Sequence, residues 1–207
     1  LEAVTRGQIR RLILNVPPGS SKSTLTSVVW PSYEWGPANR PHVRFIGWSY
    51  AEDLAIRDAV KCRRIVDSEI YRRLWPHVQL STDQDTKGLF ETTMSGCRQA
   101  CGITGATTGY RGSSLVIDDP HNVRDGESDL KREAAVLWAK EILPSRVNDE
   151  NSSIVIVAQR VHNEDVCGVY LEDKRWDRVV LPMEYDSTHP YPSRTKLNFV
   201  DWRTKDG

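Results

Sequence analysis

The chain has 207 residues, enough for one sizeable domain with at most a tail in addition. Apolar residues make up 39% and charged residues 27% of it, which excludes wholesale disorder and permits a packed core. Its 28 basic and 28 acidic side chains balance, so net charge gives no sign of a polyanionic partner. No stretch approaches the roughly 18 apolar residues of a membrane span, and no secretory signal pattern is present, so no membrane contact is expected.

The cysteines argue against a disulfide framework, since they are few and scattered. Cys97 and Cys101 are the only close pair, and no well-spaced histidine accompanies them. We therefore expect ordinary thiols rather than a zinc site, and a reducing, cytosolic compartment. Because the sequence begins at Leu1 rather than Met and ends in a polar stretch, we expect it to be a fragment of a longer protein. The four cysteines are Cys62, Cys97, Cys101 and Cys167.

Apolar runs rich in β-branched residues predict the strands, and several are apolar almost throughout, as in strands buried on both faces of a parallel sheet. The expected strands are residues 9–16, 42–49, 114–118, 153–159 and 178–182. Helical patterns lie between them, one of which has Ser128 as its N-cap and should end before Pro144. The expected helices are residues 22–34, 51–68, 128–142 and 163–172. This alternation predicts a doubly wound α/β fold.

Two segments depart from the alternation. Residues 81–112 are rich in Gly and Thr with short alternating runs, which predicts a small β-hairpin or meander leading into the strand at 114. The stretch after Met183 is rich in Pro, Ser, Thr and charged residues, which is typical of a strap or linker. We therefore expect a catalytic domain over 1–185, followed by a linker over 186–207.

The first motif with chemical content is ILNVPPGSSKSTLTS, residues 13–27. It has the form of a phosphate-binding loop, G-x-x-x-x-G-K-[ST], except that Ser21 replaces the second glycine. In such a loop Lys22 would neutralise phosphate charge and the Ser23 hydroxyl would bind Mg²⁺. The alternative is a Gly-Ser turn before a helix capped by Ser20 or Ser21. The candidate nucleotide-binding residues here are Pro18, Gly19, Ser20, Ser21, Lys22, Ser23 and Thr24.

The replacement of the second glycine by Ser21 affects the backbone conformation of the loop and not its chemical groups, because the Lys-Ser pair is intact. A Ser21 backbone in a conformation reserved for glycine would indicate strain. An ordinary helical or extended value would show that the glycine was not needed.

The second motif, SLVIDDPHN, has two carboxylates at the end of an apolar strand. In P-loop ATPases such a strand lies beside the loop, where the first carboxylate holds the Mg²⁺ shell and the next polarises the attacking water. Asp118 fits the first role and Asp119 the second. Asp-Asp-Pro could also simply begin a turn. Both motifs occurring in this order favours an ATPase.

Two further segments have arginines and polar groups near strand ends. IVIVAQRVHNEDV places Gln159 at a strand tip, where it would sense the γ-phosphate, and Arg160 beside it as either a phosphate contact or a salt-bridged strand end. TTGYRGSS presents Arg111, either as an arginine finger acting in cis or across a ring interface, or as a solvated loop residue. The candidate catalytic residues are thus Asp119, Lys22 and Arg111.

Residues 51–75 contain several Arg and Lys side chains interspersed with Asp and Glu. This pattern is typical of a solvated helix face, and contact with a DNA backbone is the alternative. The tryptophans are expected to pack in the core and at its edges rather than to stack on bases. They are Trp30, Trp35, Trp48, Trp75, Trp138, Trp176 and Trp202.

Taken together, NVPPGSSKST…VVWPSYEWGP, RFIGWSYAEDLAIRDAVKCRRIVDSEIYRRLWP, ITGATTGYRGSSLVIDDPHN and IVAQRVHNEDVCGVYLE resemble the N-terminal ATPase domain of the large terminase subunit of tailed bacteriophages. The resemblance runs from about residue 8 to 185. It implies a RecA-like (ASCE) P-loop fold with a mostly parallel sheet, which hydrolyses ATP with Mg²⁺ to move double-stranded DNA into the procapsid. It also implies a pentameric ring on the portal, a small terminase subunit as partner, and action in the host cell cytoplasm.

By the same resemblance, Lys22 and Ser23 match the Walker A lysine and serine. Asp118 matches the Walker B aspartate, and Asp119 matches the adjacent catalytic carboxylate. The family usually has Glu where Asp119 stands, often has an arginine where Gly19 stands, and often has a Thr-rich coupling motif where Ala158-Gln159-Arg160 stands. The family's nuclease domain is not in this chain. Two other functions stay open: a helicase-type nucleic-acid ATPase, and a non-hydrolysing assembly module that binds nucleotide weakly.

Overall fold

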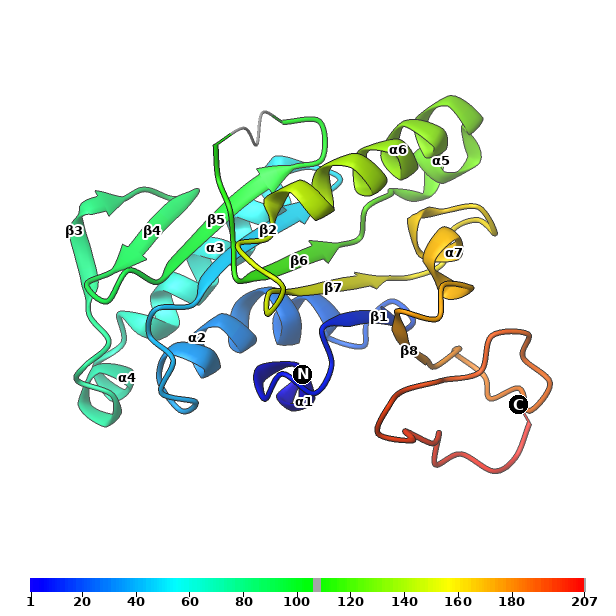
Figure 1. Cartoon of the computed structure of the whole chain (residues 1–207), viewed down its shortest axis with the longest axis horizontal. Coiled ribbons are helices and arrows are strands. Elements are labelled where there is room, and N and C mark those ends of the chain that lie inside the picture. Colours follow the sequence, from blue (N-terminus) through cyan, green and yellow to red (C-terminus); the bar gives the residue numbers. More distant parts are fainter. Residues whose placement is uncertain (106–108, 207) are drawn as a thin grey trace.

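A single twisted sheet organises the chain in the computed structural model, which describes residues 1–105 and 109–206 (Figure 1). Its strand order is β3-β4-β5-β2-β6-β7-β1-β8. All neighbours from β5 to β8 pair in parallel, and β3 and β4 add an antiparallel extension at one edge. The strands are β1 Arg11–Asn15, β2 Arg44–Ser49, β3 Leu80–Asp85, β4 Leu89–Thr92, β5 Cys97–Gly102, β6 Ser114–Asp118, β7 Ser153–Ala158 and β8 Asp177–Val180.

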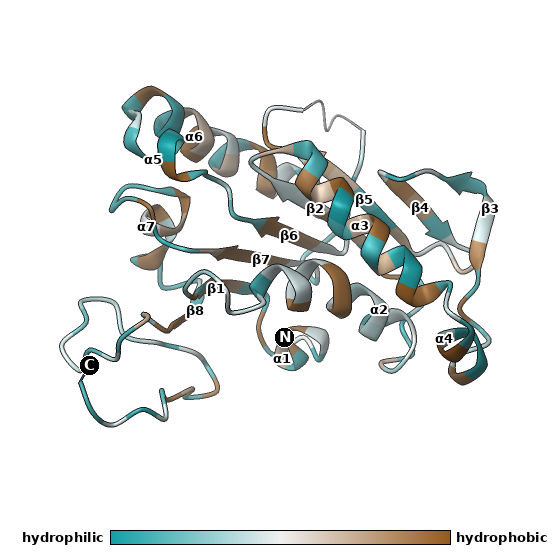
Figure 2. Ribbon diagram, turned by 180° about the vertical axis from the view of Figure 1, so that it is seen from behind, coloured by the Kyte–Doolittle hydropathy of each residue, from teal (hydrophilic) through white to brown (hydrophobic). Residues whose placement is uncertain are grey.

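Helices cover both faces of the sheet, as expected for βαβ connections. They are α1 Glu2–Thr5, the π-helix η1 Thr24–Val29, α2 Trp30–Trp35, α3 Glu52–Val66, α4 Glu69–Leu74, α5 Val123–Glu127, α6 Asp129–Arg146 and α7 Val166–Leu171. The side chains of β6 show how the sheet separates two cores: Val116 packs on the side of η1, α2 and α3, whereas Leu115 and Ile117 pack on the side of α6 and α7. Strands buried on both faces are therefore apolar throughout, and Figure 2 shows β6 and β7 as hydrophobic ribbons between more polar helices.

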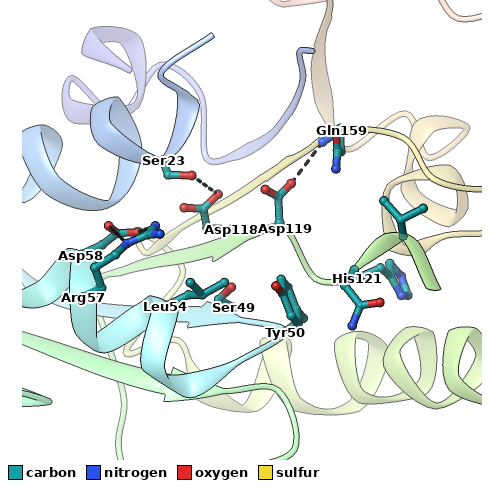
Figure 3. Close-up of a pocket in the computed structure, with 12 residues that line it drawn as sticks. Ser23, Ser49, Tyr50, Leu54, Arg57, Asp58, Asp118, Asp119, His121 and Gln159 are labelled. Atoms are coloured by element: carbon teal, nitrogen blue, oxygen red, sulfur yellow. Dashed lines mark hydrogen bonds and ion pairs between the residues drawn. The ribbon is translucent and has the colours of Figure 1, made fainter. Parts of the chain in front are cut away.

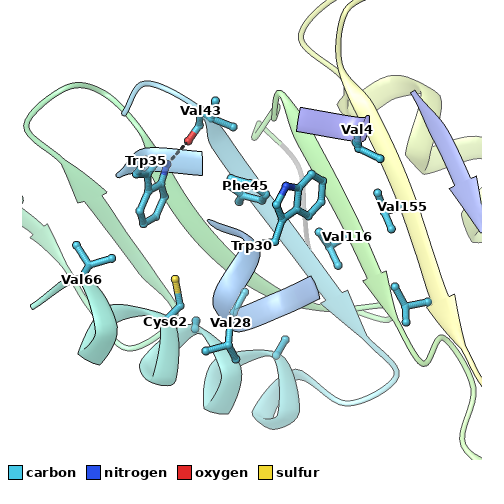
Figure 4. Packing of buried hydrophobic residues seen from close by; sticks show 14 of the residues in the cluster. Val4, Val28, Trp30, Trp35, Val43, Phe45, Cys62, Val66, Val116 and Val155 are labelled. Atoms are coloured by element: carbon cyan, nitrogen blue, oxygen red, sulfur yellow. Dashed lines mark hydrogen bonds between the residues drawn. The ribbon is translucent and has the colours of Figure 1, made fainter. Parts of the chain in front are cut away.

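Aromatic side chains fill the core under η1, α2 and α3 (Figure 4). Trp30 packs edge-on against Phe45 with ring centroids 5.1 Å apart, and Trp35 contacts the same ring at 6.1 Å. The Trp35 indole N–H donates to the carbonyl of Val43 at 2.8 Å, so its one polar group is satisfied inside the core. The expectation of core packing holds for these tryptophans, but Trp202 in the C-terminal stretch is 73% exposed.

The five strands expected from apolar runs are all present, and the Gly/Thr-rich segment forms the meander β3-β4-β5. Residues 106–108 of that segment lie outside the described residues. One boundary was wrong: α6 continues to Arg146 with Pro144 inside it. The missing N–H of Pro144 falls in the last turn on an exposed face, where water can solvate the carbonyl left without a partner. The short helices α1, α4 and α5 were not expected.

Strand order and register determine which side chains meet at the carboxyl edge of the sheet. β7 lies between β1 and β6, so one strand separates the carboxylate strand from the strand before the loop. The register pairs Asp118 with Ser49 on β2 and with Val157 on β7, and Asn15 with Ala158. The tips of β1, β2, β6 and β7 therefore end at one level.

The C-terminal stretch joins the sheet at β8. Arg178 and Arg194 exchange two backbone hydrogen bonds of 2.8 and 2.7 Å, and the Ser193 hydroxyl bonds both the N–H and the C=O of Val180. Beyond this bridge, residues 195–206 have no helix or strand. Among the described residues, no helix is long and apolar enough to cross a membrane.

Gly47 leaves room for the buried side chain of Arg98 beside the middle of β2. A Cβ at this position would lie 2.3 Å from Nη1 and Nη2 of Arg98, whose side chain is buried. We expect Gly47→Ala to lower the free energy of unfolding by about 1–3 kcal/mol through overpacking. Urea denaturation of this variant and of Gly88→Ala, where a Cβ has 3.8 Å of clearance, gives the comparison. Equal stability of the two variants would contradict this account of Gly47.

Candidate functional site

A cavity of about 290 Å³ lies at the carboxyl edge of the sheet, where the tips of β2, β6 and β7 face the start of the helical segment after β1. Several predicted site residues line it together with residues from α3 (Figure 3). The lining residues are Ser23, Ser49, Tyr50, Leu54, Arg57, Asp58, Asp118, Asp119, His121, Asn122, Val123 and Gln159.

The loop after β1 has two residues with positive φ: Gly19 at +79° and Ser21 at +58°. Ser21 therefore occupies the left-handed region that the replaced glycine would enter at no steric cost. For a serine this conformation costs on the order of 1 kcal/mol. The Ser20 hydroxyl donates to the Pro17 carbonyl at 2.7 Å and closes the turn that precedes it. The loop thus keeps a left-handed backbone at this position without its glycine.

Asp118 holds the start of the helical segment against the end of β6. Its two carboxylate oxygens accept hydrogen bonds from the hydroxyls of Ser23 at 3.0 Å and Ser27 at 3.2 Å (Figure 3 shows the first). These serines lie one turn apart across the start of the π-helix η1, a wide turn that is frequent at functional sites. The motifs predicted to meet do meet, across 95 residues of sequence.

The environment of Asp118 opposes its charge. Burial raises the pKa of the carboxyl to about 6; the hydrogen bonds from Ser23 and Ser27 act against the shift, while the charge of Asp119 adds to it. Since Asp118 lies near the cavity wall and is only 7% exposed, a cation entering there would be attracted by a poorly solvated carboxylate.

Asp119 is bound to the ends of β2 and β7 and to the loop after β1. Its Oδ2 lies 3.0 Å from Nζ of Lys22, and its Oδ1 accepts from the backbone N–H of Gln159 at 3.2 Å. Its own N–H donates to Val157, its carbonyl accepts from the N–H of Tyr50, and its φ is +46°. Aspartate tolerates this left-handed backbone better than most residues. The carboxylate is thereby aimed into the cavity beside the candidate phosphate lysine.

The oxygen atoms of Ser23 and Asp118 fit a hard divalent cation. A hydroxyl and a carboxylate 3.0 Å apart form the protein half of a typical Mg²⁺ shell, in which substrate phosphates and water supply the rest. Within the described ranges no cluster of three or more His, Cys, Asp or Glu side chains could hold a metal alone, and the four cysteines are buried and free. Ser23 and Asp118 are thus the residues of this cavity that could hold a divalent cation.

The two arginines predicted at the site lie away from the cavity. Arg160 donates to Asp165 at 2.9 Å and to the carbonyls of His162 and Asn163, which is the salt-bridged strand end left open as an alternative. Arg111 is exposed and is not among the described residues that line the cavity. Gln159, in contrast, lines the cavity and binds Asp119 through its backbone.

Sequence reasoning missed most of the cavity lining, including Tyr50, Arg57 and His121. His121 is buried and accepts the N–H of Val166 at the start of α7 through Nε2, and burial lowers its pKa, so it remains a neutral acceptor. Its place within the motif SLVIDDPHN, two residues after Asp119, was an available signal. Arg57 was assigned to a solvated helix face, because the sequence does not show that the first turns of α3 face the tip of β6.

The positive φ of Ser21 predicts that glycine is tolerated there. We expect Ser21→Gly to raise the free energy of unfolding by up to about 1 kcal/mol, because relief of the left-handed strain exceeds the added freedom of the unfolded chain. Ser20→Gly is the matched control, since it removes the hydrogen bond to Pro17 and should destabilise by about 0.5–1 kcal/mol. Urea denaturation measures both. Equal destabilisation by the two variants would count against a strained Ser21.

The raised pKa of Asp118 predicts a carboxylate that lowers stability at neutral pH. The folded pKa of about 6 exceeds the unfolded value of 3.8, so the destabilisation is complete above pH 6 and disappears as the pH falls toward 4. In EDTA at pH 8, Asp118→Asn should therefore be more stable than the unmutated chain by about 2 kcal/mol, with no advantage at pH 4. Asp83→Asn on the exposed face of β3 is the control. Chemical denaturation at both pH values tests this, and a less stable Asp118→Asn at pH 8 would refute it.

Comparison with known proteins supports the fold. No family model matches the chain, and no curated protein matches it by sequence. Among solved structures, the HK97 bacteriophage large terminase matches with a TM-score of 0.59 and 15% identity over 83% of this chain. The large terminase of a thermophilic bacteriophage matches with a TM-score of 0.50 and 11% identity over 86%. The chain spans 35% and 41% of those two chains. At these identities the likeness concerns the fold, and it confirms the predicted RecA-like α/β architecture.

Proposed function

We propose that the chain binds ATP with Mg²⁺ and hydrolyses it as the motor domain of a terminase large subunit that moves double-stranded viral DNA into a procapsid. The observation that carries this proposal is the meeting of two distant motifs in one cavity. The Ser23 hydroxyl contacts Asp118 and the Lys22 ammonium contacts Asp119, both at 3.0 Å. The alternative interpretation of the loop, a Gly-Ser turn before a helix capped by serine, would not require contact with either Asp118 or Asp119.

The loop would receive the phosphates through the backbone N–H groups of residues 19–24 and the start of the helical segment. A triphosphate would draw Lys22 from Asp119, because the phosphate oxygens carry more negative charge than one carboxylate. Asp119 would then be free to accept a hydrogen bond from water. Mg²⁺ held by Ser23 and Asp118 would neutralise charge on the outer phosphates. A cavity of about 290 Å³ suits a phosphate chain rather than a whole nucleotide.

Hydrolysis at this site would be an in-line transfer to water. A bond forms between the water oxygen and the γ-phosphorus, and the bond from that phosphorus to the bridging oxygen breaks. The electron pair of the broken bond stays on the bridging oxygen, which becomes part of ADP. The water proton passes to Asp119 and then to solvent, leaving ADP and inorganic phosphate. Gln159, whose N–H binds Asp119, would register the loss of the γ-phosphate.

The partners belong to the same proposal and follow from the sequence resemblance of the four motifs to phage large terminases. They are double-stranded DNA, further copies in a pentameric ring on the portal, and a small terminase subunit, all in the host cell cytoplasm. Arg111 is exposed on the loop before β6, where it would reach a neighbouring subunit rather than its own cavity.

Loss of Lys22 should abolish turnover. We expect Lys22→Ala to lower steady-state ATP hydrolysis by about 100-fold or more, since it removes the cation that faces the transferred phosphoryl group. Lys87→Ala, in the exposed turn between β3 and β4, is the matched control and should leave the rate unchanged. Phosphate release measured with and without Mg²⁺ gives the comparison.

Calorimetry with ATP and its β,γ-imido analogue separates the proposed motor from its rivals. Binding without turnover would favour a non-hydrolysing module, and absence of binding would exclude the proposed function. Hydrolysis by Lys22→Ala at the unmutated rate would show that the activity arises elsewhere.

A further inference from the structure

One side of the cavity is formed by α3, which belongs neither to the phosphate-loop motif nor to the carboxylate motif. α3 begins directly after β2, and β2 pairs with β6 so that Ser49 lies opposite Asp118. The first turns of α3 therefore face the carboxylates across the cavity, and Leu54, Arg57 and Asp58 line it there (Figure 3). Of the described arginines, Arg57 is the one that lines this cavity.

The guanidinium of Arg57 is held in a fixed orientation by a buried carboxylate. Its Nε donates to Oδ1 of Asp58 and its Nη2 to Oδ2, both at 2.9 Å. The Asp58 side chain is 5% exposed and has a second cation, Lys61, at 3.6 Å. A two-point contact of this kind fixes both the plane and the direction of a guanidinium.

The same contact leaves Arg57 with donors to spare. A guanidinium has five N–H groups, and the fork on Asp58 uses two of them. Within the described part of the chain the remaining N–H groups have no protein acceptor, and the Arg57 side chain is 50% exposed. The hydrogen bonds with Asp58 raise the pKa of Arg57, and the charge of Asp118 raises it further, which places the cation within electrostatic range of the candidate metal ligand.

The charges around the cavity are unevenly distributed. Asp58, Asp118 and Asp119 face it with three carboxylates, and Lys22 is the cation on the loop side. A triphosphate with Mg²⁺ would place the oxygens of its terminal phosphoryl group on the side away from the loop, where a second cation would offset their negative charge. Arg57 lies on that side, whereas Arg160 is bound to Asp165 and Arg111 lies outside the cavity.

We propose that Arg57 binds the terminal phosphate of the nucleotide held by its own chain, and that Asp58 is the residue that positions it. This inference rests on the proposed function and assigns to the same chain a phosphate-binding arginine that the loop itself lacks. Arg57 would stabilise the negative charge on the terminal phosphoryl oxygens with the donors not used by Asp58.

The test measures whether Arg57 recognises the third phosphate. Calorimetry compares the β,γ-imido analogue of ATP with ADP for the unmutated chain, Arg57→Ala, Arg57→Lys and Asp58→Asn. Arg57→Ala should weaken analogue binding by about 10- to 100-fold and ADP binding by less than about threefold, because only the analogue has a terminal phosphate at this position. Arg57→Lys should bind the analogue with an affinity between those of the unmutated chain and Arg57→Ala, since an ammonium keeps the charge but cannot make the two-point contact. Asp58→Asn should also weaken binding of the analogue more than binding of ADP, but by a smaller factor than Arg57→Ala.

Arg64→Ala is the matched control, because Arg64 is exposed on the same helix and does not line the cavity. It should leave both affinities unchanged. Equal losses for analogue and ADP in Arg57→Ala, or no loss, would overturn the inference while leaving the proposed function intact if the unmutated chain turns ATP over. Failure of the unmutated chain to bind either nucleotide would overturn both.

Mixing two defective variants tests whether Arg57 acts within its own chain. Arg57→Ala and Lys22→Ala should each hydrolyse ATP slowly, and an equimolar mixture should be no faster than their mean. Recovery of activity in the mixture would show that Arg57 completes a neighbour's site and would overturn the same-chain assignment. Thermal melting of each variant confirms that the comparison is made on folded protein.

Discussion

The burial of one carboxylate is the constraint on which the site depends. Asp118 joins β6 to the helical segment after β1 through Ser23 and Ser27, and each of its two carboxylate oxygens accepts from one of these serines. The same burial that makes the carboxylate attractive to a cation makes its charge costly, as its pKa of about 6 shows. Asp119 adds a left-handed backbone and Ser21 another. The loop and the cavity thus contain groups that each oppose stability, and the two apolar cores on either face of the sheet must compensate for them.

The elements that were predictable from sequence are those set by local composition. Buried parallel strands need apolar side chains on both faces, so runs such as SLVID and SIVIVA revealed β6 and β7 directly. The loop and the carboxylate pair were recognisable because phosphate chemistry needs those residue types in that order. The continuation of α6 past Pro144 was not recognisable, since it depends on which face of the last turn meets solvent.

What could not be predicted came from the arrangement of elements in space. The insertion of β7 between β1 and β6 is a matter of topology, and the residues of β7 do not indicate it. Arg57 is similar: its helix has the mixed charge pattern of a solvated face, and only the parallel pairing of β2 with β6 brings its first turns to the cavity. Ser21 was predictable only in part. The pattern marked its position as unusual, but only the backbone angle of +58° shows that the left-handed turn persists without glycine.

The bridge between Arg178 and Arg194 has a consequence for the outer edge of the sheet. β8 is the terminal strand beside β1, and an uncovered edge of this kind offers unpaired N–H and C=O groups to other chains. The backbone of Arg194 and the hydroxyl of Ser193 occupy those groups at Arg178 and Val180. A division of the chain at residue 185 would separate β8 from the segment that shields it. The segment from Ser193 to Arg194 therefore covers part of the open edge of β8 and leaves fewer of its backbone groups free to pair with another strand.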